Sequence, residues 1–204
     1  MEIREFAERI LFAETIEAKL GVEPRLSDRR PDYSGVLPAL PGRPERLGLN
    51  DERPRPSFPG LIRGGNPTHS GQVLHFFANH ELLAVELMAL FLLRFPKAPP
   101  AFRRAVVHTI HEEQEHLKLY RERMADFGVS LGDVPVSRFF WDCLASMKGP
   151  LAYLSGMSLT LEQANLDFSK HYMQRFAELG DDKTAALLKQ VYDDEIGHVK
   201  LGVV

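Results

Sequence analysis

The sequence is organised around seven residues, 110–116, that read IHEEQEH. Within this stretch Glu113 precedes His116 by three residues. Three residues of an α-helix turn through about 300°, so the two side chains leave nearly the same face. A carboxylate and an imidazole that project together make half of a metal site. One Glu-x-x-His motif arises often by chance, but Glu195 and His198 repeat it near the end of the chain.

Composition indicates one soluble globular domain. The chain has 204 residues, of which 44% are hydrophobic and 26% charged, with a net charge of −3. No global basic field therefore points to nucleic acid or membrane. A single cysteine excludes an intrachain disulfide, and the charged N-terminus does not resemble a signal peptide. The most apolar stretch, residues 82–95, is too short to cross a bilayer and contains Glu86. We expect a cytoplasmic protein.

Residues 1–69 are expected to form a helix and an irregular arm that pack on the rest of the chain. Helical spacing of apolar residues predicts one helix over residues 2–20, ended by Gly21 and Pro24. Residues 24–67 hold nine of the 14 prolines and eight arginines, without periodicity. This composition favours an extended covering arm, and the arginines make phosphate or RNA binding an alternative role.

Residues 70–204 are expected to form a bundle. Apolar periodicity, Pro96, Pro100 and Gly180 divide them into helices near 71–95, 100–127, 151–179 and 182 onward, with a short helix at 137–147 in a crossover. Two hairpins joined by a long crossover predict an all-α, ferritin-like four-helix bundle. The sequence ends at Val204, six residues after His198, so we expect the last helix to be short on that side.

Each Glu-x-x-His pair has a lone carboxylate opposite it in its predicted hairpin. Facing residues of an antiparallel hairpin lie at equal distances from the turn. Reflection of the first pair lands on residues 80–81, which include Glu81. Reflection of the second lands on residues 163–164, where the nearest acid is Glu162. The spacings agree, since Glu113 follows Glu81 by 32 residues and Glu195 follows Glu162 by 33. The predicted metal ligands are Glu81, Glu113, His116, Glu162, Glu195 and His198.

Converging carboxylates in a core cannot neutralise one another, and buried charge is costly unless it is paired or bound to a cation. Two divalent cations would balance four carboxylates. Mixed nitrogen and oxygen ligation without thiolate suits iron, with manganese or a mixed manganese–iron pair as alternatives. Glu86 is the other candidate on the first helix, but it lies about 140° round from Glu81. Glu81 lies on an apolar face of the predicted helix, which favours it as the metal ligand, and Glu86 remains the alternative.

Four further features surround the predicted ligands. We expect crosswise contacts from Asp194 to His116 and from Glu112 to His198, because a ligating histidine usually donates its other N–H to a carboxylate. The alternative for each acid is a solvated position. Tyr120 follows His116 by one turn and is either near the metals or an ordinary core tyrosine. Two small side chains on the helix face of Glu162, those of Ser155 and Ser158, predict a cavity for dioxygen or a substrate group. The remaining histidines are expected at the surface or in a polar core: His69, His75, His80, His108, His111 and His171.

The six predicted ligands resemble the pattern of the ferritin-like di-iron carboxylate superfamily over about residues 71–204. The run Asn79–Ala89, after a proline- and arginine-rich arm, resembles most closely the domain-of-unknown-function 455 family. The resemblance implies a paired-metal site and oxygen chemistry, and it implies no particular substrate.

Three functions remain open from the sequence. The first is an oxidoreductase or hydroxylase in which two metal ions activate dioxygen for an unknown organic substrate, with an unknown electron donor. The second is a ferroxidase or other iron-handling protein. The third is a module that binds RNA or protein and has a structural metal site. A homodimer is possible, and no membrane partner is expected.

Overall fold

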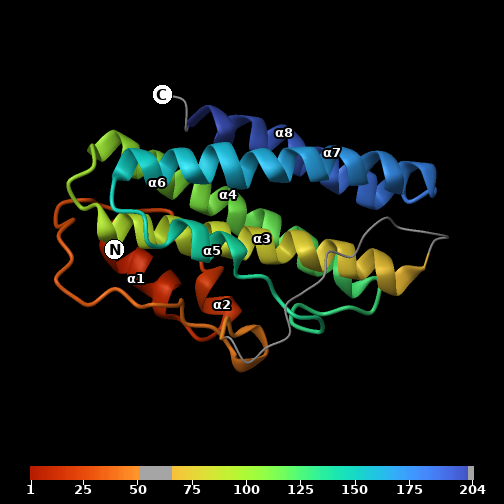
Figure 1. Cartoon of the computed structure of the whole chain (residues 1–204), viewed down its shortest axis with the longest axis horizontal. Coiled ribbons are helices and arrows are strands. Elements are labelled where there is room, and N and C mark those ends of the chain that lie inside the picture. The colour runs from red at the N-terminus through yellow and green to blue at the C-terminus, as the bar shows by residue number, and fades with distance from the viewer. Residues whose placement is uncertain (51–65, 202–204) are drawn as a thin grey trace.

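The computed structural model describes residues 1–50 and 66–201 (Figure 1). These residues form helices and no named strand; their one isolated bridge joins Glu2 to Ser27. The prediction of an all-α protein is therefore confirmed.

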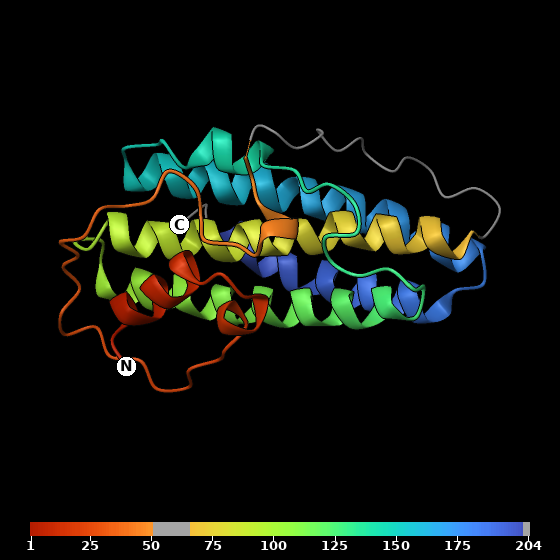
Figure 2. The ribbon, with the colours of Figure 1, turned by 90° about the horizontal axis from the view of Figure 1, so that it is seen from below.

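Four long helices lie side by side: α3 (Pro67–Arg94), α4 (Pro100–Ala125), α7 (Gln163–Glu178) and α8 (Asp182–Leu201). α3 packs antiparallel to α4, α7 packs antiparallel to α8, and α4 contacts α8 (Figures 1 and 2). Local sequence sets the ends of these helices. The Asn66 side chain caps α3 by accepting from the backbone N–H of Thr68. Gly128 and Gly180 follow α4 and α7 with φ of 68° and 76°, a conformation that favours glycine.

A crossover of residues 126–149 returns the chain along the bundle, so that α4 and α7 run in the same direction (Figure 1). It contains α5 (Phe139–Leu144). Polar groups of α3 hold it in place. His75 Nε2 accepts from the Gly132 N–H at 2.9 Å, and Asn79 Nδ2 donates to the Ser137 carbonyl at 3.2 Å.

After the crossover, α6 (Pro150–Gly156) leads into a π-helical segment, η2 (Met157–Glu162), and then into α7. The expectation of one regular helix over 151–179 is wrong in this respect. A π-turn inserts one residue into a helix, which apolar periodicity over a long window does not reveal.

The N-terminal segment, residues 1–50, lies along α3 and α4 (Figure 2). The predicted single helix over residues 2–20 is wrong, because two helices form instead: α1 (Ile3–Phe12) and α2 (Ile16–Lys19). The chain is extended at Ala13, and the Thr15 side chain caps the second helix by accepting from the Ala18 N–H. Threonine is a preferred N-cap residue, so Thr15 marks the start of α2 in the sequence.

The arm is irregular over residues 21–50 except for η1 (Glu45–Leu47), as its composition predicts. The predicted arm extends to residue 67, but α3 already begins at Pro67. Residues 51–65, with Arg53, Arg55 and Arg63, lie outside the described residues.

α3 is the central helix. Among the described helices it alone is long and apolar enough to cross a membrane. The prediction that the most apolar stretch is too short to do so considered residues 82–95 only, whereas the helix has 28 residues. Within the fold, 94% of its most apolar window is buried. Such burial is what the core helix of a soluble protein shows.

Candidate metal centre

The six predicted ligands lie together in the middle of the bundle. Glu81 comes from α3, Glu113 and His116 from α4, and Glu162 from the last residue of η2. α8 contributes the remaining pair, Glu195 and His198. All six side chains are buried, with exposed fractions of 4% or less.

These residues form two overlapping groups, each able to hold a metal ion. Glu81 and His116 belong to the first group and Glu162 and His198 to the second. Glu113 and Glu195 belong to both. Within each group the potential ligand atoms lie within 4.8 Å of one another. The two groups, each of which could hold a metal ion, therefore share two carboxylates.

Both imidazoles turn Nδ1 toward the cluster. His116 Nδ1 lies 3.0 Å from Glu113 Oε2, and His198 Nδ1 lies 2.8 Å from Glu195 Oε2. The other ring nitrogens meet the crosswise acids expected from the sequence. His116 Nε2 is 3.1 Å from Asp194 Oδ2, and His198 Nε2 is 3.0 Å from Glu112 Oε2. An outer carboxylate on Nε2 fixes the ring and leaves Nδ1 to face inward.

Electrostatics in the cluster follow from burial and crowding. Burial and the neighbouring carboxylates raise the pKa of Glu81 and Glu162 well above the ordinary glutamate value. Burial also opposes charge on His116, but the hydrogen bond and negative charge of Glu113 outweigh it and raise the pKa of His116 to about 9. The two imidazoles likewise overcome the effect of burial on Glu113 and lower its pKa. Without a metal, protons must supply the positive charge that the carboxylates require.

The donor set fits divalent cations. It consists of carboxylates and imidazoles, without a thiol, which suits iron or manganese. Glu81 Oε2 and Glu162 Oε2 are both buried without a hydrogen-bond partner. Buried polar atoms are normally satisfied, so these oxygens are available for cations.

Glu86, the alternative to Glu81, lies in neither group. Its carboxylate is fully buried and paired with two cations of the N-terminal segment. Lys19 Nζ lies 3.1 Å from Glu86 Oε1, and Arg43 Nη2 lies 2.6 Å from Glu86 Oε2. It is therefore engaged in an ion pair away from the cluster, as a boundary carboxylate would be.

Sequence reasoning missed the role of Asn165. Its Nδ2 donates to Glu195 Oε1 at 2.8 Å and to Glu81 Oε1 at 3.2 Å. One amide thus orients a carboxylate of each hairpin. Asn165 follows Glu162 by three residues, the same spacing as in the two Glu-x-x-His pairs, and that spacing was the available signal.

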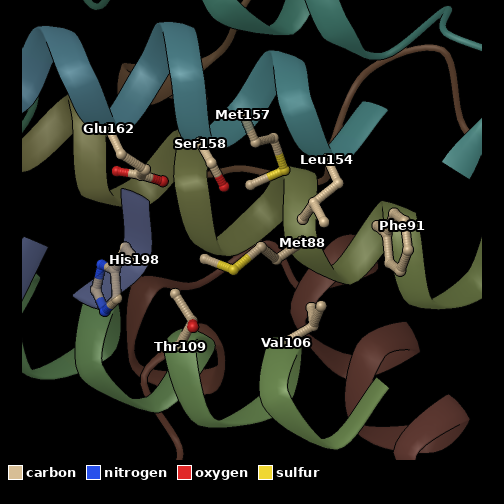
Figure 3. Close-up of a pocket in the computed structure, with 9 residues that line it drawn as sticks. All are labelled: Met88, Phe91, Val106, Thr109, Leu154, Met157, Ser158, Glu162 and His198. Atoms are coloured by element: carbon tan, nitrogen blue, oxygen red, sulfur yellow. The ribbon is translucent and has the colours of Figure 1, made fainter. Parts of the chain in front are cut away.

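A small cavity of about 20 Å³ lies beside Glu162 and His198 (Figure 3). Ser158 and Thr109 are among its lining residues, and the Ser158 hydroxyl points into it. The other lining residues are apolar: Met88, Phe91, Val106, Leu154 and Met157. Its volume suffices for about one water-sized molecule. The sequence predicted Ser158 at a cavity correctly, whereas Ser155 is not among the lining residues.

Tyr120 is fully buried beside the cluster, stacked on Phe77 with ring centroids 5.5 Å apart. Burial, followed by the negative charges of Glu81 and Glu195, raises its pKa well above the usual tyrosine value. Its hydroxyl is therefore protonated at neutral pH.

Fold and site together define an all-α protein with a buried cluster of carboxylates and histidines that can hold metal ions. The chain belongs to the family described as "Protein of unknown function (DUF455)", which matches residues 4–204. The family resemblance of the run Asn79–Ala89 is thereby confirmed. No curated protein and no solved structure is significantly similar to the chain.

Proposed function

We propose that the protein is a ferritin-like di-metal carboxylate protein that uses two iron ions to activate dioxygen and oxidise or hydroxylate an organic substrate. The observation that carries this proposal is the pair of four-residue groups sharing Glu113 and Glu195. Two hairpins joined by a crossover that returns the chain along the bundle support the ferritin-like assignment.

Glu113 and Glu195, which belong to both groups, would help to hold both ions. Glu81 and His116 would complete one coordination shell, and Glu162 and His198 the other. The bound metals would supply the redox chemistry and the activation of dioxygen. Asp194 and Glu112 would each accept a hydrogen bond from the Nε2–H of a ligating histidine. The Nδ1 lone pair is then free to bind the ion.

The chain's own residues would confine the chemistry to one side of the centre. The cavity beside Glu162 and His198 has apolar walls and two hydroxyls, so it would hold a small molecule and exclude bulk water. Ser158 and Thr109 would orient that molecule by hydrogen bonds. Filling the cavity with Ser158→Phe should therefore abolish turnover while the metal content stays that of the wild type.

The size of the cavity favours a second candidate, iron oxidation or another form of iron handling. About 20 Å³ admits dioxygen more readily than an organic substrate. Size-exclusion chromatography separates the two proposals in part, because iron storage needs a closed shell of many subunits. A monomer or dimer would exclude storage and leave the oxygenase and ferroxidase reactions to be compared by product analysis.

A third candidate, binding of RNA through the arm, has less support. Arg43 of the arm is buried in its ion pair with Glu86 and cannot contact a phosphate. Filter binding of RNA with a salt titration would test the remaining arginines.

The decisive experiment is metal analysis with an optical spectrum on protein purified from iron-supplemented cells. We expect about two irons per chain, one for each four-residue group. Glu113→Ala should lose both ions, because Glu113 belongs to both groups. Asp193→Ala, an exposed acid of α8, is the matched control and should retain both ions. Absence of metal in the wild type under every loading condition would overturn the proposal.

A further inference from the structure

We propose that His80 positions Glu162 by donating a hydrogen bond from Nε2 to the Glu162 carboxylate. The inference rests on the proposed di-metal function and assigns a further residue to that site. His80 Nε2 and Glu162 Oε2 lie 3.9 Å apart, and both atoms are buried without a hydrogen-bond partner. Two unsatisfied polar atoms that face each other in a core are uncommon, because each costs free energy.

Glu162 shares a hydrogen bond with Glu195 inside the cluster, but within the described residues its Oε2 has no donor at hydrogen-bond distance. Glu81 and Glu195 accept from Asn165, and Glu113 contacts His116. Glu162 lies instead at the end of η2, where the helix changes from π to α. A carboxylate on such a segment needs an anchor from a neighbouring helix to keep one orientation.

His80 is suited to that task because its own position is fixed. It lies on α3 directly before Glu81, with an exposed fraction of 4%. Its ring packs edge-on against Phe140 of α5, with centroids 5.2 Å apart. Its separation from Glu162 exceeds a hydrogen bond by about 1 Å, which a small side-chain movement closes.

α3 would then serve both metal positions. Glu81 belongs to the first group directly, and His80 would act on the second group through Glu162. His80 itself belongs to neither group, so its effect is on the placement of a ligand. Loss of such a supporting hydrogen bond typically weakens metal affinity about 10- to 100-fold.

An anaerobic ferrous titration with equilibrium dialysis tests this assignment. His80→Phe keeps a ring against Phe140 and removes the donor, whereas His80→Gln restores a donor. We expect wild type to bind two ions and His80→Phe to bind the second about 10- to 100-fold more weakly, with the first unchanged. His80→Gln should recover most of the lost affinity. Circular dichroism of each variant tests whether the protein remains folded.

His75→Phe is the matched control, because His75 is a second buried histidine of α3 against the crossover and contacts no ligand of the cluster. It should leave both affinities unchanged. The assignment is overturned if His80→Phe binds the second ion as tightly as wild type, or if His75→Phe weakens it equally. A wild type that binds no metal instead overturns the proposed function, so the two failures are distinguishable.

Discussion

Two buried glutamates five residues apart on α3 have opposite surroundings. Glu81 lies among other carboxylates, whereas Glu86 lies between Lys19 and Arg43. The five-residue spacing turns the two side chains about 140° apart on a helix, so one faces the cluster and the other faces the N-terminal segment. The same residue type is therefore expected to bind a cation at one position and to stabilise the fold at the other.

Conversion of each glutamate to glutamine separates these roles. Glu86→Gln leaves two buried cations without their anion, so it should destabilise the protein by about 3–5 kcal/mol while folded chains keep their metal. Glu81→Gln replaces a buried acid whose pKa the cluster raises with a neutral amide, so the apo protein should be at least as stable as wild type but should lose metal. Urea unfolding and metal analysis measure the two properties. A Glu86→Gln protein that is stable and metal-depleted would contradict the assignment.

His75 provides a prediction for pH that does not involve the predicted ligands. Burial lowers the pKa of His75 from 6.5 to about 4. Between these values the unfolded chain binds a proton that the folded chain does not, so the contribution of His75 to stability should fall as the pH falls through this window and level off below about 4. A shift of this size corresponds to on the order of 3 kcal/mol. Urea unfolding at pH 7 and pH 4 measures it.

His75→Gln is the control for that prediction. Glutamine can still accept from the Gly132 N–H, but it does not titrate. The difference in stability between pH 7 and pH 4 should therefore be smaller in the variant than in wild type by about the contribution of one buried histidine. An identical pH dependence in both proteins would show that His75 does not contribute.

The sequence predicted the residues of the cluster because two geometric rules apply to any antiparallel helical hairpin. Helical periodicity put Glu113 and His116 on one face, and reflection through the turn located Glu81 and Glu162. The supporting contacts of Asn165 and His80 were not predictable in this way. They depend on how α7 and α3 are rotated about their axes, which the packing of the whole bundle decides.

At the scale of elements, the π-helical segment η2 brings Ser158 to the cavity and Glu162 to the cluster. Both flanks are fixed independently. On the α6 side the Tyr153 hydroxyl donates to the Leu87 carbonyl at 2.7 Å, and on the α7 side Asn165 donates to Glu195. The extra residue of the π-turn lets both flanks make their contacts at once. Sequence periodicity could not reveal it, because each flank is an ordinary amphipathic helix.

Deletion of residue 160, in the middle of η2, tests this explanation. The segment should become regular α-helix, which rotates one flank by about 100° relative to the other. Either Tyr153 or Glu162 then leaves its position, so we expect lower thermal stability and loss of at least one metal ion, with helix content nearly unchanged. Circular dichroism and metal analysis measure these outcomes. Wild-type stability and metal content in the deletion variant would show that the π-turn is dispensable.

At the scale of the whole molecule, the N-terminal segment shares the core of the bundle. Apolar residues of α1 and α3 belong to one hydrophobic cluster. Buried polar contacts join the same parts: Arg103 of α4 pairs with Asp28 at 2.8 Å, and Gln114 Nε2 donates to the Lys19 carbonyl at 2.5 Å. A segment tied by both kinds of contact should unfold together with the bundle.

Trp141, the single tryptophan, reports on this coupling. It lies in α5 of the crossover, and its Nε1 donates to the Ala39 carbonyl of the arm at 2.9 Å. If arm, crossover and bundle form one cooperative unit, tryptophan fluorescence and far-ultraviolet circular dichroism should give the same midpoint in urea. Arg43→Met, which leaves Glu86 with Lys19 alone, should lower both midpoints together. A tryptophan transition that precedes loss of helix would instead mean that the arm and crossover detach from a bundle that is stable by itself.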